Sequence, residues 1–118
     1  MKLRIQGNSL RLRLNQKEVA LVREGGHVES SIEFAPGCSL SYLLESSTIA
    51  ESTSTTFDGR AIRVTIPAGR MVEWTESDQV GIETRSNGGI GLLIEKDFQC
   101  LHRSDDQEPD AFPRPLTS

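Results

Sequence analysis

Charged side chains alternate with apolar ones in several short stretches of this sequence. The charged positions are Lys2, Arg4, Arg11, Arg13, Arg63 and Arg85 among the basic residues, and Glu29, Glu33, Glu45, Glu83 and Glu95 among the acidic ones. Residues two apart on a β-strand point to the same face of a sheet, so the pattern predicts a charged face opposite an apolar one. Ammonium and guanidinium groups bind phosphate or carboxylate oxygens. The candidate anion-binding residues are Lys2, Arg4, Arg11, Arg13 and Arg63.

The glutamates predict a second kind of chemistry, because carboxylate oxygens are the usual ligands of hard divalent cations. Glu29, Glu33 and Glu83 are the candidate ligands of Mg²⁺. Beside arginines that hold phosphates, they would form a metal-dependent phosphohydrolase. The same residues turned to solvent would form only a solubilising surface. The tendency of antiparallel sheets to keep one face wet favours the surface interpretation.

Cys100 and His102, together with Asp97 and His27, offer ligand types that suit a transition metal. The Cys-x-His spacing supplies only two ligands, so a buried cysteine beside a surface histidine explains the pattern better. As a nucleophile and base, the pair lacks an evident orienting group or oxyanion donor. We therefore assign no catalytic residue.

The composition limits the classes of partner. A chain of 118 residues with a net charge of −4 predicts one domain without general attraction to nucleic acids or anionic membranes. We expect a small anionic ligand or a protein partner instead. No stretch has the apolar length of a membrane span or a signal peptide, and two cysteines are more simply reduced thiols than a disulfide, so we expect a cytoplasmic protein.

The elements that position these residues follow a repeated pattern. The segment 5–10 (Ile-Gln-Gly-Asn-Ser-Leu) returns as 57–62 (Phe-Asp-Gly-Arg-Ala-Ile), at an offset of 52 residues. A second match, 42–45 with 92–95, has an offset of 50. Between them the expected equivalents are Val19 with Met71, Val22 with Trp74, and Val28 with Val80. Each copy reads as strand, strand, helix, strand, strand.

The pattern predicts an α+β fold built from a duplicated ββαββ unit. The expected strands are 2–6, 9–14, 27–34, 39–46, 51–57, 60–66, 80–85 and 90–96, and the expected helices are 16–24 and 67–76. We expect one domain over 1–102, with repeats 1–48 and 53–100, followed by an acidic, proline-containing, extended or flexible tail over 103–118. The eight strands, mostly antiparallel, should form one curved sheet or a closed barrel, because closure removes exposed edges.

The alignment of the two copies also predicts which side chains lie in the core and how the basic residues are divided between the copies. Trp74, Tyr42 and Phe57 are expected to be core side chains. Lys2 and Arg4 correspond to Ser54 and Thr56 in the second copy, so an anion site should be asymmetric.

This duplicated arrangement resembles the CYTH superfamily, in which a wide antiparallel barrel encloses a tunnel that handles triphosphates. The stretch Leu10-Arg11-Leu12-Arg13 is similar to a basic strand of that superfamily. Where those enzymes carry Glu-x-Glu-x-Lys, this chain has Met1-Lys2-Leu3-Arg4-Ile5, so the acidic metal-binding pair is missing. Segments 7–14, 76–81 and 95–101 resemble a family of small uncharacterised bacterial proteins, a likeness that covers nearly the whole chain and implies no activity.

Three functions are consistent with these observations. The first is a small binding or accessory domain for an anionic ligand or a protein partner. The second is a divergent CYTH-like phosphohydrolase that acts on triphosphate-type substrates with Mg²⁺. The third is a structural or interaction module without a ligand. Inward-facing arginines would favour the first two, and outward-facing ones the third.

Overall fold

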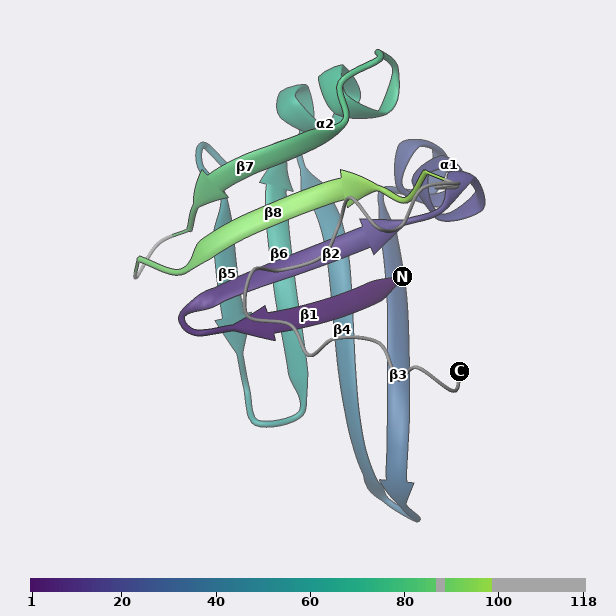
Figure 1. Cartoon of the computed structure of the whole chain (residues 1–118), viewed down its shortest axis with the longest axis vertical. Helices are drawn as coiled ribbons and strands as arrows, with labels where there is room; N and C mark the ends of the chain where they lie inside the picture. Colours follow the sequence, from purple (N-terminus) through teal and green to yellow (C-terminus); the bar gives the residue numbers. More distant parts are fainter. Residues whose placement is uncertain (87–88, 99–118) are drawn as a thin grey trace, which may run out of the picture.

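Two four-stranded sheets pack face to face, and two helices lie at one end of the pair (Figure 1). This computed structural model describes residues 1–86 and 89–98. The strands are β1 (Lys2–Gln6), β2 (Ser9–Leu14), β3 (His27–Ala35), β4 (Cys38–Ser47), β5 (Ser54–Phe57), β6 (Ala61–Pro67), β7 (Gly81–Arg85) and β8 (Gly91–Lys96), and the helices are α1 (Gln16–Gly25) and α2 (Ala68–Thr75). The predicted α+β class and the order of the elements are confirmed. The predicted tail, 103–118, lies outside the described residues.

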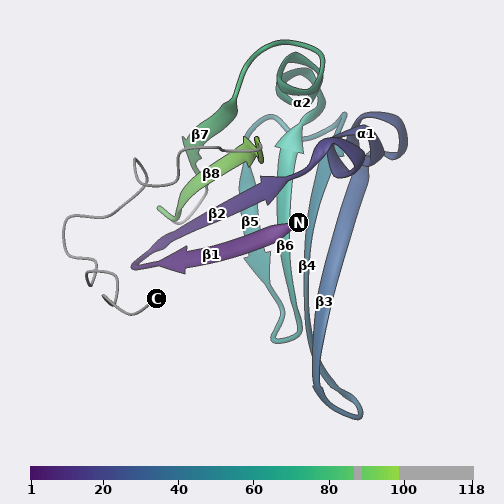
Figure 2. The same cartoon turned by 45° about the vertical axis from the view of Figure 1, so that its right-hand side comes forward.

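Each sheet combines one hairpin from each half of the chain. Sheet A has the strand order β1-β2-β8-β7, and sheet B has the order β3-β4-β6-β5. The outer pairs of each sheet are antiparallel, whereas the central pairs, β2 with β8 and β4 with β6, are parallel. The strands of sheet A cross those of sheet B in both views (Figures 1 and 2).

The predicted single curved sheet or closed barrel is wrong. Strands β1 and β7 are the edges of sheet A, and β3 and β5 are the edges of sheet B. The apolar faces of the two sheets bury each other, so the core is sealed without closure of the hydrogen-bonded ring. The charged faces therefore point outward to solvent, and the strands of residues 1–86 and 89–98 enclose no lumen for them to line. Outward-facing arginines were expected to favour a module without a ligand, so a binding site has to be argued from the way the outward charges are arranged.

The two halves occupy corresponding places in the two sheets. Leu10 of β2 pairs with Leu92 of β8, and their counterparts Ile62 of β6 and Tyr42 of β4 pair in the same parallel manner. These counterparts differ by the 52 and 50 residues read from the sequence. Exchanging the halves therefore converts the strand order of one sheet into that of the other.

One expected equivalence is wrong. Val28 pairs with Leu44, and the corresponding antiparallel pair in the other sheet is Ile82 with Ile94. The counterpart of Val28 is therefore Ile82, whereas Val80 precedes β7 and is half-exposed. The segment between α2 and β7 is longer than the one between α1 and β3. The β7–β8 hairpin is shorter than the β3–β4 hairpin, so β8 again aligns with β4.

The core lies between the sheets and beneath the helices. The helices contribute Val19 and Val22 from α1, and Met71 and Trp74 from α2, as their spacing predicts. Phe57 was expected in the core, but its side chain is 62% exposed. It lies at the β5–β6 turn, at the opposite end of β6 from α2, where no helix covers the gap between the sheets. Neither helix in the described part of the chain is long and apolar enough to cross a membrane.

Asp58 forms the predicted turn between β5 and β6. Its Oδ1 accepts hydrogen bonds from the backbone N–H groups of Ala61 and Arg60, at 2.8 Å each. These bonds hold the pKa of Asp58 below its usual value of 3.8, because they favour the carboxylate. Its contribution to stability is therefore present above pH 3.8 and is lost as the pH falls through the lower folded-state value.

Helix α1 begins with the capping box that its sequence predicts. Asn15 Oδ1 accepts a hydrogen bond from Glu18 N at 2.9 Å, and Glu18 Oε1 accepts one from Asn15 N at 3.0 Å. Gly26 ends the helix with a φ of 83°, in the left-handed region that favours glycine. The cap also joins α1 to the end of β2, which carries part of the charged face of sheet A.

Removal of this cap should destabilise the fold measurably. Asn15→Ala is expected to lower the free energy of unfolding by about 1 kcal/mol, because the Glu18 N–H loses its acceptor. Urea denaturation measures the change. Asn15→Ser keeps a capping oxygen and should retain most of the stability. An alanine variant as stable as the unchanged protein would show that the cap contributes nothing.

Candidate anion-binding site

The outer face of sheet A carries a group of basic side chains. Leu12 and Leu14 of β2 are buried between the sheets, so Arg11 and Arg13 project from the opposite side. We call the basic face the outward side chains of Lys2 and Arg4 on β1, Arg11 and Arg13 on β2, and Arg85 on β7. The structure thus brings together four of the five predicted anion-binding residues.

Like charges face each other across the β1–β2 hairpin. Lys2 is directly opposite Arg13, and Arg4 is directly opposite Arg11. Such opposed pairs on one face of a sheet destabilise it unless an anion lies near both charges. The hairpin therefore concentrates positive potential on a chain whose total charge is −4.

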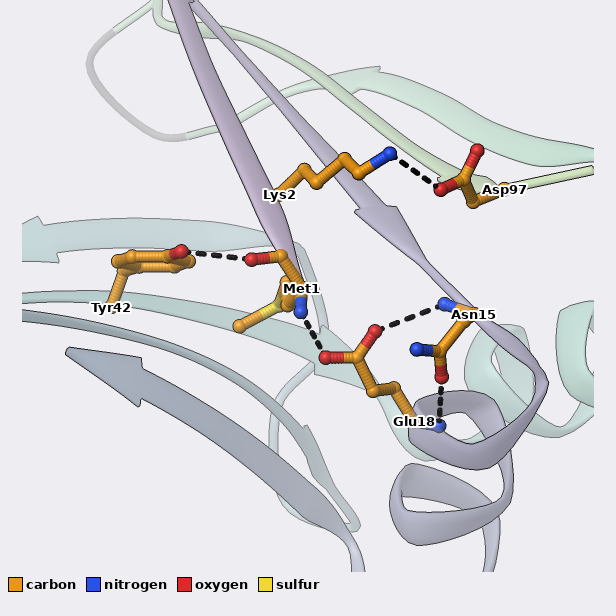
Figure 3. Close-up of polar contacts among 6 residues, drawn as sticks. All are labelled: Met1, Lys2, Asn15, Glu18, Tyr42 and Asp97. Atoms are coloured by element: carbon orange, nitrogen blue, oxygen red, sulfur yellow. Dashed lines mark hydrogen bonds and ion pairs between the residues drawn. The ribbon is translucent and has the colours of Figure 1, made fainter.

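Three carboxylates neutralise part of this charge. Glu95 Oε1 lies 2.7 Å from Arg13 Nε and 3.5 Å from Arg11 Nε. Asp97 Oδ2, just after β8, lies 3.0 Å from Lys2 Nζ (Figure 3). The third is Glu83 on β7. Five basic groups against three acidic ones leave the face positively charged.

A hollow of about 400 Å³ opens on this face. Arg4, Arg11, Arg85 and Glu83 are among the charged residues that line it, and Leu93 of β8 supplies an apolar side chain between them. Arg85 Nη1 donates a hydrogen bond to the carbonyl of Gly89 at 3.1 Å, which holds this guanidinium beside the β7–β8 turn. The hollow is large enough for a small anion with several oxygens.

Contacts around Met1 fix the start of β1. The Tyr42 hydroxyl donates a hydrogen bond to the Met1 carbonyl at 2.8 Å (Figure 3). The amino group of Met1 forms an ion pair with Glu18, whose other carboxylate oxygen completes the cap of α1. These contacts connect β1 to sheet B and to α1, so they position Lys2 at the margin of the basic face.

Arg63 lies elsewhere in the molecule. It projects from β6 on the outer face of sheet B, away from sheet A. Its Nη1 lies 3.1 Å from Glu45 Oε1 and 3.0 Å from Glu45 Oε2, and the Thr65 hydroxyl donates to Oε1 of the same carboxylate at 3.0 Å. Arg63 therefore belongs to a separate ion pair.

The three predicted Mg²⁺ ligands do not meet. Glu29 and Glu33 are on β3 in sheet B, whereas Glu83 is on β7 in sheet A, and the two outer faces point in opposite directions. Within 1–86 and 89–98, no group of three or more histidine, cysteine or acidic residues has the arrangement of a metal site. Cys100 and His102 lie outside the described residues.

The comparisons with known proteins identify a family. A model described as a family of unknown function (DUF7009) matches residues 1–116. The chain belongs to this family. No curated protein and no solved structure matched the chain. The predicted resemblance to an uncharacterised family is confirmed, and a relation to the CYTH superfamily is not shown.

In this member of DUF7009, the corresponding positions of the two sheets differ in charge. The pair Arg11 and Glu95 has a counterpart in Arg63 and Glu45, which also form an ion pair. The remaining basic positions, Lys2, Arg4, Arg13 and Arg85, correspond to Ser54, Thr56, Thr65 and Ser31. Sheet B therefore presents hydroxyl groups where sheet A presents cations.

Arg85 was not among the anion-binding residues predicted from the sequence. Its alternation with Ile82 and Thr84 placed it on a charged face, but nothing local showed that β7 joins the sheet of β1 and β2. Only the parallel pairing of β2 with β8 brings Arg85 to the hollow that Arg4 and Arg11 also line.

Proposed function

We propose that the protein is a binding or accessory domain whose basic face holds the phosphate or carboxylate groups of an anionic ligand. The observation that carries this proposal is the placement of Lys2 opposite Arg13 and of Arg4 opposite Arg11. An anion that contacts both strands would relieve the repulsion that Glu95 and Asp97 leave, and it would gain charge-assisted hydrogen bonds at the same time. Two opposed pairs favour a ligand with several negative charges.

The ligand is expected to be a compact anion or a short acidic segment of a protein. The basic face is open to solvent, so binding should weaken as salt concentration rises. The outward side chains of sheet A include no aromatic residue for base stacking, and the chain is negatively charged overall, which argues against nucleic acid as the ligand. We expect binding in the cytoplasm, where an exposed thiol such as Cys38 stays reduced.

Binding is proposed in preference to phosphate hydrolysis. Of the three glutamates predicted to hold Mg²⁺, only Glu83 lies beside the hollow, and Glu29 and Glu33 are on the other sheet. A catalytic metal site needs several ligands fixed in one place. The arrangement therefore supports electrostatic capture of an anion.

A matched pair of arginine variants tests the proposal. Arg11→Gln is expected to weaken the binding of inorganic triphosphate about tenfold, because one charge-assisted hydrogen bond is worth at least about 1.5 kcal/mol. Arg63→Gln changes the corresponding arginine of sheet B and should leave binding unchanged. Isothermal titration calorimetry measures both affinities. Citrate and a pentaglutamate peptide, titrated in the same way, distinguish a small carboxylate ligand from an acidic protein segment.

The two variants also control for stability. Each loses a surface ion pair with a corresponding glutamate, so each should lose no more than about 1 kcal/mol of unfolding free energy. Equal weakening by Arg63→Gln would contradict the assignment to sheet A. Failure of the unchanged protein to bind any of the three probes would contradict the function itself.

A further inference from the structure

We propose that the acidic segment 103–116 of this chain docks on the β1–β2 hairpin of the same molecule, with its carboxylates on the basic face and Phe112 in a neighbouring apolar groove. The electrostatic part rests on the proposed function, because the same cations hold the carboxylates. The apolar part is independent of it.

The groove lies between the sheets, at the end opposite the helices. It has a volume of about 390 Å³, and its apolar lining residues are Ile5, Leu10, Leu40, Phe57, Ile62 and Ile90. Ile5 and Phe57, which occupy corresponding places in the two halves, are each 62% exposed. Clustered apolar side chains left open to water are typical of a surface that binds another segment.

The chain leaves sheet A at the end where the helices lie, beside Lys2 and at the opposite end of β1 from the groove. The N–H of Asp97 donates to the carbonyl of Leu14 at 2.8 Å, and its carboxylate lies 3.0 Å from Lys2 Nζ. Phe98, the last described residue, therefore follows at the margin of the basic face. Ile5 is three residues along β1 from Lys2, or about 10 Å.

The segment is long enough to reach the groove. Phe112 is fourteen positions after Phe98, and an extended chain of that many steps spans up to about 46 Å. The family match continues to residue 116, so this segment belongs to the sequence that the family shares. Its only large apolar residues after position 102 are Phe112 and Leu116.

Acidic residues precede the apolar one along the segment, just as cations precede apolar residues along the β1–β2 hairpin. From the chain exit toward the β1–β2 turn, the two pairs of opposed cations come first and the pair Ile5 and Leu10 follows. Along the segment, the carboxylates at 105, 106, 108 and 110 come first and Phe112 follows. The acidic part can therefore cross the cations while Phe112 passes around the β1 edge into the groove.

Nuclear Overhauser effects on the full chain test the docking. We expect contacts from the Phe112 ring to the methyl groups of Ile5, Leu10 and Ile62, and their loss in Phe112→Ala. Neutralisation of the segment by Asp105→Asn, Asp106→Asn, Glu108→Gln and Asp110→Asn should weaken the same contacts. It should also strengthen triphosphate binding, because the competing carboxylates are removed.

Each outcome decides the proposal. Contacts seen only between labelled and unlabelled chains in a mixed sample would overturn it in favour of a second copy in the groove. Absence of contacts from Phe112 to these methyl groups would overturn it outright, even if triphosphate still bound to the basic face. Contacts in the unchanged chain, together with no triphosphate binding even by the variant with the neutralised segment, would support the docking of Phe112 and contradict the proposed function instead.

Discussion

Trp74→Ala is expected to lower the free energy of unfolding by about 3 to 5 kcal/mol, the largest stability loss that we predict for a single substitution. The Trp74 side chain is fully buried between α2 and the sheets. Its Nε1 donates a hydrogen bond to the Val80 carbonyl at 3.0 Å, and Lys96 Nζ lies 5.9 Å from the ring centroid. Alanine would leave a large cavity and remove both contacts. Urea denaturation followed by circular dichroism measures the loss.

Two controls separate burial from helix propensity. Val72 is on the same helix but is half-exposed, so Val72→Ala should change stability by less than about 0.5 kcal/mol. Trp74→Phe keeps an aromatic ring and should cost less than Trp74→Ala. A loss below about 1 kcal/mol for Trp74→Ala would contradict the position of this residue at the centre of the core.

Four simultaneous substitutions on the basic face are expected to abolish triphosphate binding. The substitutions Lys2→Ser, Arg4→Thr, Arg13→Thr and Arg85→Ser give sheet A the residues that sheet B carries at the corresponding positions. Because sheet B folds with those residues on exposed strands, the variant should remain folded. Its losses include the ion pairs of Lys2 with Asp97 and of Arg13 with Glu95, each worth about 1 kcal/mol or less, and the hydrogen bond from Arg85 to the Gly89 carbonyl. Isothermal titration calorimetry measures the binding.

The reverse change supplies the matched control. Ser54→Lys, Thr56→Arg, Thr65→Arg and Ser31→Arg place cations on the outer face of sheet B, beside Arg63. This variant should bind more triphosphate than the unchanged protein. If the quadruple variant of sheet A remained folded and bound triphosphate with undiminished affinity, the basic face would not be the site.

The local elements could be predicted because their signals are short-range. Asn15 and Glu18 cap α1 across three residues, and Asp58 with Gly59 forms a turn between adjacent strands. Trp74 and Val22 could be placed in the core from helix spacing alone. Each of these features depends on residues that lie only a few positions apart in the sequence.

The pairing of strands from the two halves could not be predicted in the same way. Leu10 pairs with Leu92 across most of the chain, and no turn residue or local pattern marks that contact. The sequence therefore predicted one curved sheet or a closed barrel, although burial of one apolar sheet face against another satisfies the same pattern. Phe57 was misplaced for the same reason, because its exposure depends on where the other sheet ends.

The candidate site was predictable to the extent that it lies on one hairpin. Lys2, Arg4, Arg11 and Arg13 come from two consecutive strands, so their common face follows from alternation alone. Arg63 was grouped with them because a single curved sheet or barrel would have put all the charged positions on one face, but the two copies place corresponding residues on different sheets. Repeated sequence thus predicted similar elements, and it could not show which of them would share a surface.

NMR chemical shifts of the backbone amides, followed during titration with inorganic triphosphate, test most directly the claim that the basic face of sheet A binds an anion. We expect the amide signals of Arg4, Arg11 and Leu93 on sheet A to shift further with each addition of triphosphate, and these shifts to become smaller as the salt concentration rises. Signals of Glu29 and Arg63 on sheet B should stay in place. Shifts centred on sheet B, or none on either sheet at millimolar triphosphate, would contradict the account.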